Sequence, residues 1–211
     1  MAKAPATEKL QIAGPQGRLE ALLEIPDNAS AERIAVICHP HPLHQGTMLN
    51  KVVHTLARAM NDLGMPALRF NFRGVGDSEG EYSSGDGEID DVIAVSSYVR
   101  MRWRNPDIWL CGFSFGGVVA ARAANRVAPA QLITVAPAVN VLGPKLSAQP
   151  EVAWLVVQGD ADEIVPAEDV IQWVNSLAPG PELVLLAGVG HFFHGHLVEL
   201  RETLVTNLST A

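Results

Sequence analysis

The sequence predicts an α/β fold in which helices cover both faces of a mostly parallel β-sheet. Short apolar segments of strand length alternate with amphipathic segments of helix length along most of the chain. A hairpin of two antiparallel strands precedes this alternation, flanking the turn-forming residues 14–17. With 211 residues, of which 48% are hydrophobic, the chain is long enough for one substantial core and short for two domains. We therefore expect a single domain over residues 1–211.

The expected strands are short, and those after the hairpin are apolar enough to be buried on both faces. The hairpin occupies residues 8–13 and 19–25 at one sheet edge, and the later strands occupy 33–38, 67–72, 108–112, 131–135, 153–158 and 183–187. Helices are expected at 51–63, 88–102, 115–127, 167–176 and 197–208. Ligands bind such sheets at the carboxyl ends of the strands, so we expect function in the loops that follow each strand.

The charge balance argues against nucleic acid and membranes as partners. Fifteen Lys and Arg against 23 Asp and Glu give a formal charge of −8, which repels nucleic acid and anionic lipid. Residues 1–7 lack the apolar stretch of a secretory signal, and no apolar run reaches the about 18 residues that cross a bilayer. We therefore expect a cytoplasmic protein without membrane insertion, in which Cys38 and Cys111 are buried, reduced thiols.

The strongest functional signal is the segment Gly112-Phe113-Ser114-Phe115-Gly116, which follows a predicted strand and precedes a predicted helix. A G-x-S-x-G segment in this context presents its serine on a sharp strand-to-helix turn. The two glycines remove side chains that would collide where strand meets helix. Ser114 is therefore the expected nucleophile, and the backbone N–H of Phe115 is an expected oxyanion donor.

A serine nucleophile needs a general base, and the base is in turn oriented by an acid. His191 follows the last predicted strand, and in the chain order nucleophile, acid, base the histidine comes last. The acid is expected after the strand at 153–158, where Asp160 and Asp162 both qualify by position. The sequence thus predicts a Ser-His-Asp triad with two candidates for its acid.

Several of these motifs resemble the α/β-hydrolase superfamily over most of the chain. They are H-P-H-P at 39–42, N-F-R-G-V-G at 71–76, G-F-S-F-G at 112–116, G-D-A-D at 159–162 and G-H-F-F-H-G-H at 190–196. Together they look like the small, lid-poor serine hydrolases related to dienelactone hydrolase, although that enzyme's nucleophile is a cysteine. The resemblance implies hydrolysis of a small carboxylic ester or thioester through an acyl-serine, with no metal or organic cofactor.

The resemblance also chooses between candidate residues. The G-x-x-D-x-x-V-P spacing typical of the superfamily favours Asp162, which leaves Asp160 to stabilise the turn. Pro40 stands where many relatives have a glycine, and proline has no N–H. The second oxyanion donor is therefore expected to be the N–H of His41, with that of Leu43 as the alternative.

The substrate-binding surface is expected to include Leu43, Phe113 and Phe192, although core positions would suit these side chains equally well. The connection 137–151, where larger relatives insert a lid, is only a long loop, so we expect an open site for a small acyl substrate. Esterase, thioesterase, lactonase and peptidase chemistry share the triad, so the sequence leaves the substrate open. It also leaves open whether the chain forms a homodimer.

Three alternative functions remain. A metal site built from the histidines at 39, 41, 44, 191, 194 and 196 is not expected, because their spacing matches no metal-binding motif and prolines restrict the first group. An acyltransferase or a perhydrolase would use the same triad with another acyl acceptor. A binding module without turnover is disfavoured, because every triad position has a candidate in the expected chain order.

Overall fold

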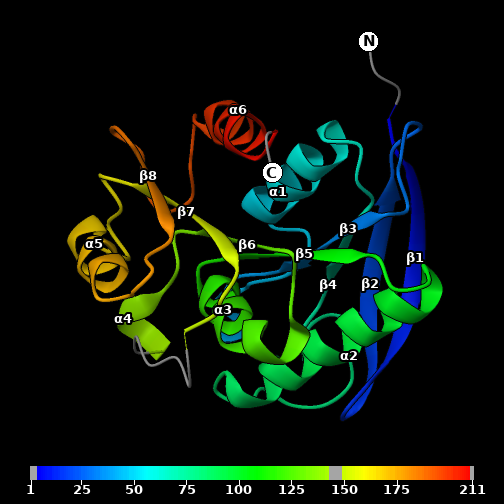
Figure 1. Cartoon of the computed structure of the whole chain (residues 1–211). Helices are drawn as coiled ribbons and strands as arrows, with labels where there is room; N and C mark the ends of the chain where they lie inside the picture. The colour runs from blue at the N-terminus through cyan, green and yellow to red at the C-terminus, as the bar shows by residue number, and fades with distance from the viewer. Residues whose placement is uncertain (1–3, 143–148, 210–211) are drawn as a thin grey trace.

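The computed structural model, which describes residues 4–142 and 149–209, contains one eight-stranded sheet with helices on both faces (Figure 1). The strand order is β1-β2-β4-β3-β5-β6-β7-β8; β2 is antiparallel to β1 and β4, and each later neighbouring pair is parallel. The strands are β1 (Ala6–Gly14), β2 (Gly17–Ile25), β3 (Arg33–Cys38), β4 (Ala67–Phe70), β5 (Asp107–Phe113), β6 (Gln131–Val135), β7 (Ala153–Gly159) and β8 (Glu182–Leu186). The predicted fold class is therefore confirmed.

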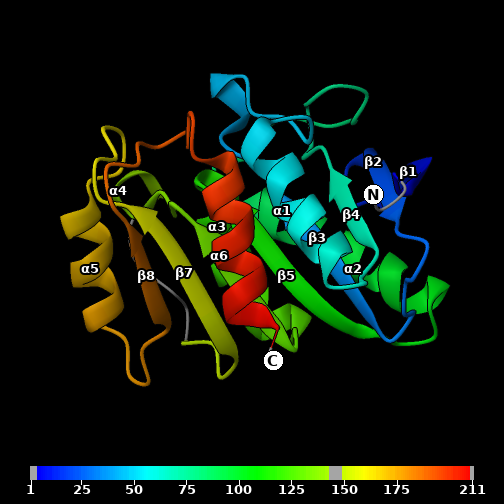
Figure 2. The same cartoon turned by 90° about the horizontal axis from the view of Figure 1, so that it is seen from above.

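The helices form a layer on each side of the sheet. Figures 1 and 2 show α1 and α6 side by side on one face, with α2 and α3 on the opposite face. The helices are α1 (Lys51–Asp62), α2 (Asp86–Arg102), α3 (Phe115–Val127), α4 (Val139–Leu142), α5 (Ala167–Asn175) and α6 (Leu197–Leu208), with a 3₁₀ turn, η1 (Pro42–His44). This arrangement buries every central strand on both faces and leaves the loops at the strand ends to form a site.

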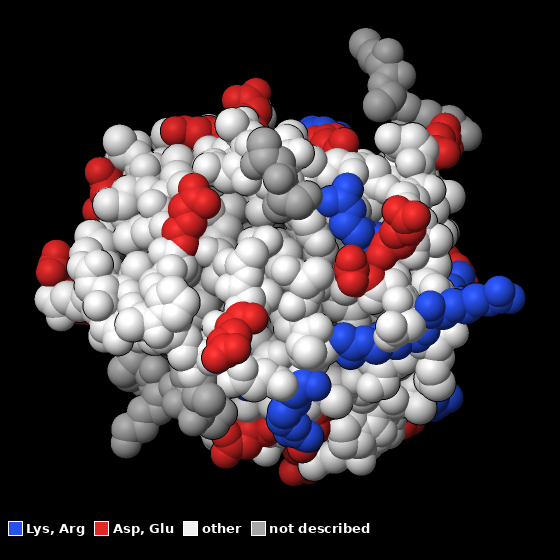
Figure 3. All heavy atoms as spheres, in the orientation of Figure 1, with Lys and Arg blue, Asp and Glu red and all other residues white. Residues whose placement is uncertain are grey.

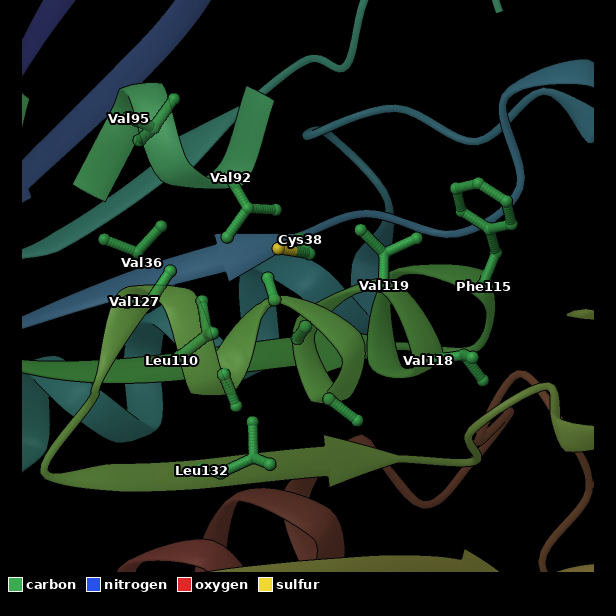
Figure 4. Close-up of a cluster of buried hydrophobic side chains, with 14 of the residues drawn as sticks. Val36, Cys38, Val92, Val95, Leu110, Phe115, Val118, Val119, Val127 and Leu132 are labelled. Carbon is green, nitrogen blue, oxygen red and sulfur yellow. The ribbon is translucent and has the colours of Figure 1, made fainter. Parts of the chain in front are cut away.

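Two apolar cores hold the layers together, one on each face of the sheet. Figure 4 shows the core beneath α2 and α3, where Val92 and Val119 from the helices meet Val36, Leu110 and Leu132 from three strands. The second core packs α1 and α6 onto the other face. Burying a side chain of this size contributes about 1.5–3 kcal/mol, so the cores fix the strand ends from which the functional loops start.

The strand β4 ends two residues earlier than the predicted end at residue 72, and a change of hydrogen-bond partners explains the difference. The N–H of Asn71 donates to the carbonyl of Glu20 at 2.8 Å, and the N–H of Phe72 donates to the ring Nε2 of His39 at 3.0 Å. Both residues are buried. The apolar residues around them in the sequence are typical of a strand, which is why the predicted strand extends to residue 72. The N–H of Asn71 still bonds to β2, next in register after the Ala21–Phe70 pair, so the ladder ends at Phe72, whose N–H bonds to a histidine ring.

Two further differences lie at the β8 side of the sheet. The strand β8 forms the second edge, so it is only partly buried, and Leu185 is 45% exposed. The connection 137–151 contains the single helical turn α4, which the sequence did not predict; residues 143–148 of that connection lie outside the described residues. The predicted burial of β8 on both faces is therefore wrong, because an edge strand lacks one neighbour.

Charged side chains of both signs lie on the surface seen in Figure 3, with the basic ones mainly on the right half of that view. Cys38 and Cys111 are both buried and unpaired. Within the described residues, no helix combines the length and the apolar character that crossing a membrane requires.

A buried ion pair joins the loop after β4 to α2. Arg73 donates to Asp91 through Nη2 at 2.7 Å and through Nε at 3.0 Å, and the two side chains are 4% and 0% exposed. Gly87 makes room for it, because a Cβ there would lie 2.1 Å from Arg73 Nη1. Burial raises the pKa of Asp91, and the hydrogen bonds from Arg73 oppose that rise. The guanidinium therefore stabilises a carboxylate that would otherwise be buried alone.

We predict that Arg73→Met lowers the free energy of unfolding by about 3–5 kcal/mol, because it leaves Asp91 buried without a counter-charge. Arg126→Met is the matched control, since Arg126 pairs with Asp90 on the surface, where the side chains are 60% and 46% exposed. That control is expected to cost less than about 1 kcal/mol. Urea unfolding of both variants measures the difference, and equal losses would contradict the assignment of a stabilising role to Arg73.

Candidate active site

Ser114 lies in the sharp turn between β5 and α3, in a strained backbone conformation. Its φ of 55° and ψ of −119° are sparsely populated by residues with a side chain. Its N–H donates to the carbonyl of Val135 at 2.9 Å. A Cβ on Gly112 would lie 2.2 Å from the carbonyl oxygen of Gly116, and a Cβ on Gly116 would lie 2.4 Å from that of His39. Only glycines therefore allow this turn to form against the end of β3.

The ring of His191 lies between Ser114 and Asp162. Its Nε2 is 3.0 Å from Ser114 Oγ and its Nδ1 is 2.8 Å from Asp162 Oδ2. The ring packs against Phe113 and Phe192, with both centroid separations 5.1 Å, and the backbone N–H of His191 donates to Glu163 at 3.2 Å. The structure thus brings the three predicted triad residues into one chain of hydrogen bonds.

Asp162, and not Asp160, is the acid that contacts His191. Its other oxygen, Oδ1, accepts N–H groups from Ile164 at 2.9 Å and from Val165 at 2.7 Å. Burial alone would raise the pKa of Asp162, but the hydrogen bonds from His191 and these two N–H groups outweigh it and hold the pKa below its usual value. Asp160 accepts the N–H of Gly188 at 2.6 Å, so its hydrogen bond joins its loop to the one after β8 and does not lie within its own turn as expected.

The loop after β3 is held by a buried histidine whose role the sequence did not predict. His39 is 0% exposed; its Nε2 accepts the N–H of Phe72, so its Nδ1 carries the proton that is donated to the carbonyl of Pro40 at 2.6 Å. Burial lowers the pKa of His39 to about 4, which keeps the ring neutral. The His-Pro repeat was the only sequence signal for this contact.

His41 lies on the cleft side of the same loop. Its Nδ1 accepts the N–H of Leu43 at 3.2 Å, and its Nε2 lies 3.2 Å from the hydroxyl of Tyr82. The ring packs against Phe115, with centroids 4.9 Å apart. Burial and the neighbouring His44 lower the pKa of His41. The N–H of Leu43 is therefore already used, and proline at position 40 has none to offer.

A cleft of about 340 Å³ opens over Ser114 and His191. Its other lining residues are Pro40, His41, His44, Gln45, Gly46, Asn50, Phe115, Ala138, Val141, Ile164 and Phe192. Within the described part of the chain, none of the lining residues is an Asp, Glu, Lys or Arg. The cleft is thus an uncharged surface beside the serine hydroxyl.

Two of the three predicted lining residues do not line this cleft, and only Phe192 does. Phe113, the last residue of β5, points into the core under α1 and α6, where it is 0% exposed and supports the ring of His191. Leu43 lies on η1, is 68% exposed, and is not among the residues that form the cleft wall. The sequence places these residues beside the site but does not fix the direction of their side chains.

The remaining histidines do not converge on one point. His194 and His196 lie in the loop before α6, and His196 pairs with Glu199 at 2.7 Å. Over residues 4–142 and 149–209, the structure contains no group of three or more His, Cys, Asp or Glu side chains arranged to hold a metal ion.

We predict that His39 makes the protein less stable as the pH falls from about 6.5 to about 4. The unfolded chain takes up a proton near the ordinary histidine pKa of about 6.5, whereas the folded chain resists protonation down to about 4. The stabilisation by neutral His39 is therefore complete above a pH of about 6.5. It decreases by about 3 kcal/mol in total as the pH falls from about 6.5 to about 4. Urea unfolding between pH 7 and 4 should give a smaller slope for His39→Gln than for the native protein.

The control for this experiment is His194→Gln, which alters an exposed ring and should leave the slope unchanged. Burial also lowers the pKa of His41 and of His54, so some pH dependence should survive in His39→Gln. Equal slopes for His39→Gln and the native protein would contradict a buried neutral His39.

Comparison with known proteins places this chain in a family. A family model described as serine aminopeptidase, S33, matches residues 31–154. An uncharacterized protein from Rickettsia prowazekii is 32% identical over 209 residues, covering 93% of this chain and 87% of that protein.

Solved structures give the same result. An α/β serine hydrolase homologue from Coxiella burnetii is 49% identical, with a TM-score of 0.90 over 95% of this chain and 97% of that one. A serine hydrolase from Xanthomonas campestris, described as lacking a lid, is 40% identical, with a TM-score of 0.90 over 99% of this chain and 96% of that one. The finer likeness to dienelactone hydrolase stays a prediction from the sequence. The chain belongs to the serine aminopeptidase S33 family of α/β serine hydrolases.

Proposed function

We propose that this protein is a single domain that hydrolyses a small, uncharged carboxylic ester or thioester through an acyl-serine intermediate. The observation that carries the proposal is the hydrogen-bonded chain from Ser114 Oγ to His191 Nε2 at 3.0 Å and from His191 Nδ1 to Asp162 Oδ2 at 2.8 Å. Ser114 and His191, two members of this hydrogen-bonded series, line the apolar cleft. A hydroxyl, an imidazole and a carboxylate in this order are the parts that acyl transfer to water requires.

In the acylation step, Ser114 Oγ attacks the carbonyl carbon of the substrate while His191 Nε2 takes its proton. The tetrahedral intermediate carries a negative oxygen, for which we assign the N–H groups of Phe115 and His41 as donors. Phe115 is the first residue of α3, where a helix leaves its N–H groups without an internal acceptor. The intermediate then expels the alcohol or thiol, which receives the proton from His191, and the acyl-serine remains.

In the deacylation step, water replaces the leaving group. His191 Nε2 takes one proton from water as the oxygen attacks the acyl carbon, and it returns that proton to Ser114 Oγ when the ester bond breaks. The carboxylate of Asp162 stabilises the imidazolium and holds Nδ1 protonated, so that Nε2 is the free base. The products are a carboxylic acid and the regenerated enzyme, and the residues named here supply every proton transfer.

The uncharged cleft favours an ester over the N-terminal peptide that the family description suggests. An aminopeptidase binds a substrate amine that is largely protonated at neutral pH, and such a cation needs a carboxylate partner. No carboxylate is among the lining residues in the described parts of the chain, and the undescribed segment 143–148 contains neither Asp nor Glu. Glu163 lies nearby, where Oε2 accepts the backbone N–H of His191, but it does not line the cleft. We infer that the acyl group of the substrate is neutral.

We predict that the native protein hydrolyses p-nitrophenyl esters between acetate and laurate, and that Ser114→Ala lowers the rate by about 10⁴-fold or more. Asp162→Asn is expected to cause a loss of similar order, because its amide no longer holds the imidazole in the required tautomer. Asp160→Asn is the matched control in the same loop and should stay near the native rate. Intact mass during turnover should show an acyl adduct on Ser114.

The same assay separates the ester function from its alternatives. Alanine p-nitroanilide, which carries a free amine, should react no faster than N-acetylalanine p-nitroanilide, which has the same leaving group and a neutral acyl part. Faster, Ser114-dependent cleavage of the free-amine anilide would replace the ester by a peptide as substrate. A native protein without turnover and without adduct would favour the binding module, and transfer of the acyl group to an added alcohol or to peroxide in preference to water would favour an acyltransferase or perhydrolase.

A further inference from the structure

A buried glutamine on β7 contacts the acid of the candidate triad. Gln158 is 0% exposed, and its Nε2 lies 3.0 Å from Asp162 Oδ2, 3.0 Å from the carbonyl of Val165 and 3.2 Å from that of Gly159. Its Oε1 is buried and has no hydrogen-bond partner within the described parts of the chain. A buried carbonyl without a partner is unfavourable, and an apolar side chain of this size would avoid that cost.

The chemistry of the surroundings fixes which way the amide of Gln158 points. The three groups around Nε2 are a carboxylate oxygen and two carbonyl oxygens, all of which are acceptors. Exchanging the nitrogen and oxygen of the amide would place Oε1 against all three. The amide must therefore donate toward Asp162.

The two donors on Oδ2 of Asp162 compete for the same oxygen. His191 Nδ1 donates at 2.8 Å and Gln158 Nε2 at 3.0 Å, while the N–H groups of Ile164 and Val165 occupy Oδ1. Each donor withdraws electron density from the carboxylate and lowers its affinity for a proton. Two further carboxylates of this loop are engaged elsewhere: Glu163 accepts the backbone N–H of His191, and Asp160 accepts that of Gly188.

We propose that Gln158 is a positioning residue that acts through Asp162: by donating to Oδ2 it limits the proton affinity of that oxygen, and thereby that of the Asp162–His191 pair. This inference rests on the triad function proposed above and deepens it. Gln158 is then a neutral, buried donor that limits the strength of the hydrogen bond between Asp162 and His191. The unpaired Oε1 is the unfavourable consequence of placing that donor in the core.

Replacing Gln158 by leucine tests this role. Gln158→Leu removes the donor and the unpaired Oε1 together, and Gln158→Met is the second variant if the branched side chain prevents folding. With p-nitrophenyl acetate, the acid limb of the kcat/KM profile should move to higher pH by about half a unit, because Oδ2 binds its remaining proton donor more strongly. The rate ratio between native protein and variant should consequently be larger on the acid limb than on the plateau.

The matched control is Gln131→Leu, the same change at a buried glutamine at the opposite end of the neighbouring strand. Gln131 is 6% exposed, and among the described residues its Nε2 donates to the carbonyl of Leu132 at 3.4 Å and not to a carboxylate. This variant should leave the acid limb in place. If Gln158→Leu also loses stability but keeps the native acid limb, Gln158 has a structural role only and the proposal is overturned.

A spectroscopic measurement makes the test independent of turnover. The proton between His191 Nδ1 and Asp162 Oδ2 should give a downfield NMR resonance, which should move further downfield in Gln158→Leu and stay in place in Gln131→Leu. If the native protein has no Ser114-dependent activity, the proposed hydrolase function fails while this resonance still tests Gln158. An unchanged resonance in both Gln158 variants would overturn the proposal even in an active enzyme.

Discussion

Ser114 has a φ of 55° and a ψ of −119°, and the contacts around it hold this unfavourable conformation in place. Its N–H donates to Val135 at the end of β6, and its carbonyl accepts the N–H groups of Gly117 at 3.0 Å and Ala138 at 3.1 Å. On the other side, Gly116 lies against the end of β3, where a Cβ would collide with the carbonyl of His39. The turn is thus clamped between two neighbouring strands, and the rest of the site is arranged around it.

The other functional residues reach Ser114 because the sheet brings strand ends together. His191 and Asp162 come from the loops after β8 and β7, on one side of the turn, whereas His39 and His41 come from the loop after β3 on the other. The neutral ring of His39 ties that loop to the end of β4 through the N–H of Phe72. The proposed oxyanion donor on the β3 side and the proposed general base on the β7–β8 side therefore follow from one parallel topology.

Local patterns in the sequence were sufficient for the fold and for the main site residues. The apolar strands and the glycines around Ser114 are short-range signals, and the structure places both Ser114 and Asp162 within hydrogen-bonding distance of His191. Side-chain direction depends on tertiary packing instead. Phe113 therefore proved to be core, and Leu43 proved to be exposed outside the cleft lining.

Hydrogen bonds made by buried polar side chains were equally invisible in the sequence. The early end of β4 depends on a contact between Phe72 and His39, and the environment of Asp162 depends on Gln158, four residues before it on β7. His39 directly follows the apolar strand β3, and Gln158 lies within the apolar strand β7. The composition of these segments indicates only that they are buried. Polar residues of this kind, adjacent to a recognisable motif, are where a sequence-based account of such a site is least complete.

The most direct test of the assembled triad is covalent labelling by a fluorophosphonate, followed by peptide mapping of the modified residue. We predict one label per chain, located on Ser114 and absent from Ser114→Ala, because His191 contacts the hydroxyl of Ser114 and activates it in the proposed mechanism. Absence of labelling in the native protein, or a label on a different residue, would contradict the central claim that Ser114 is an activated nucleophile.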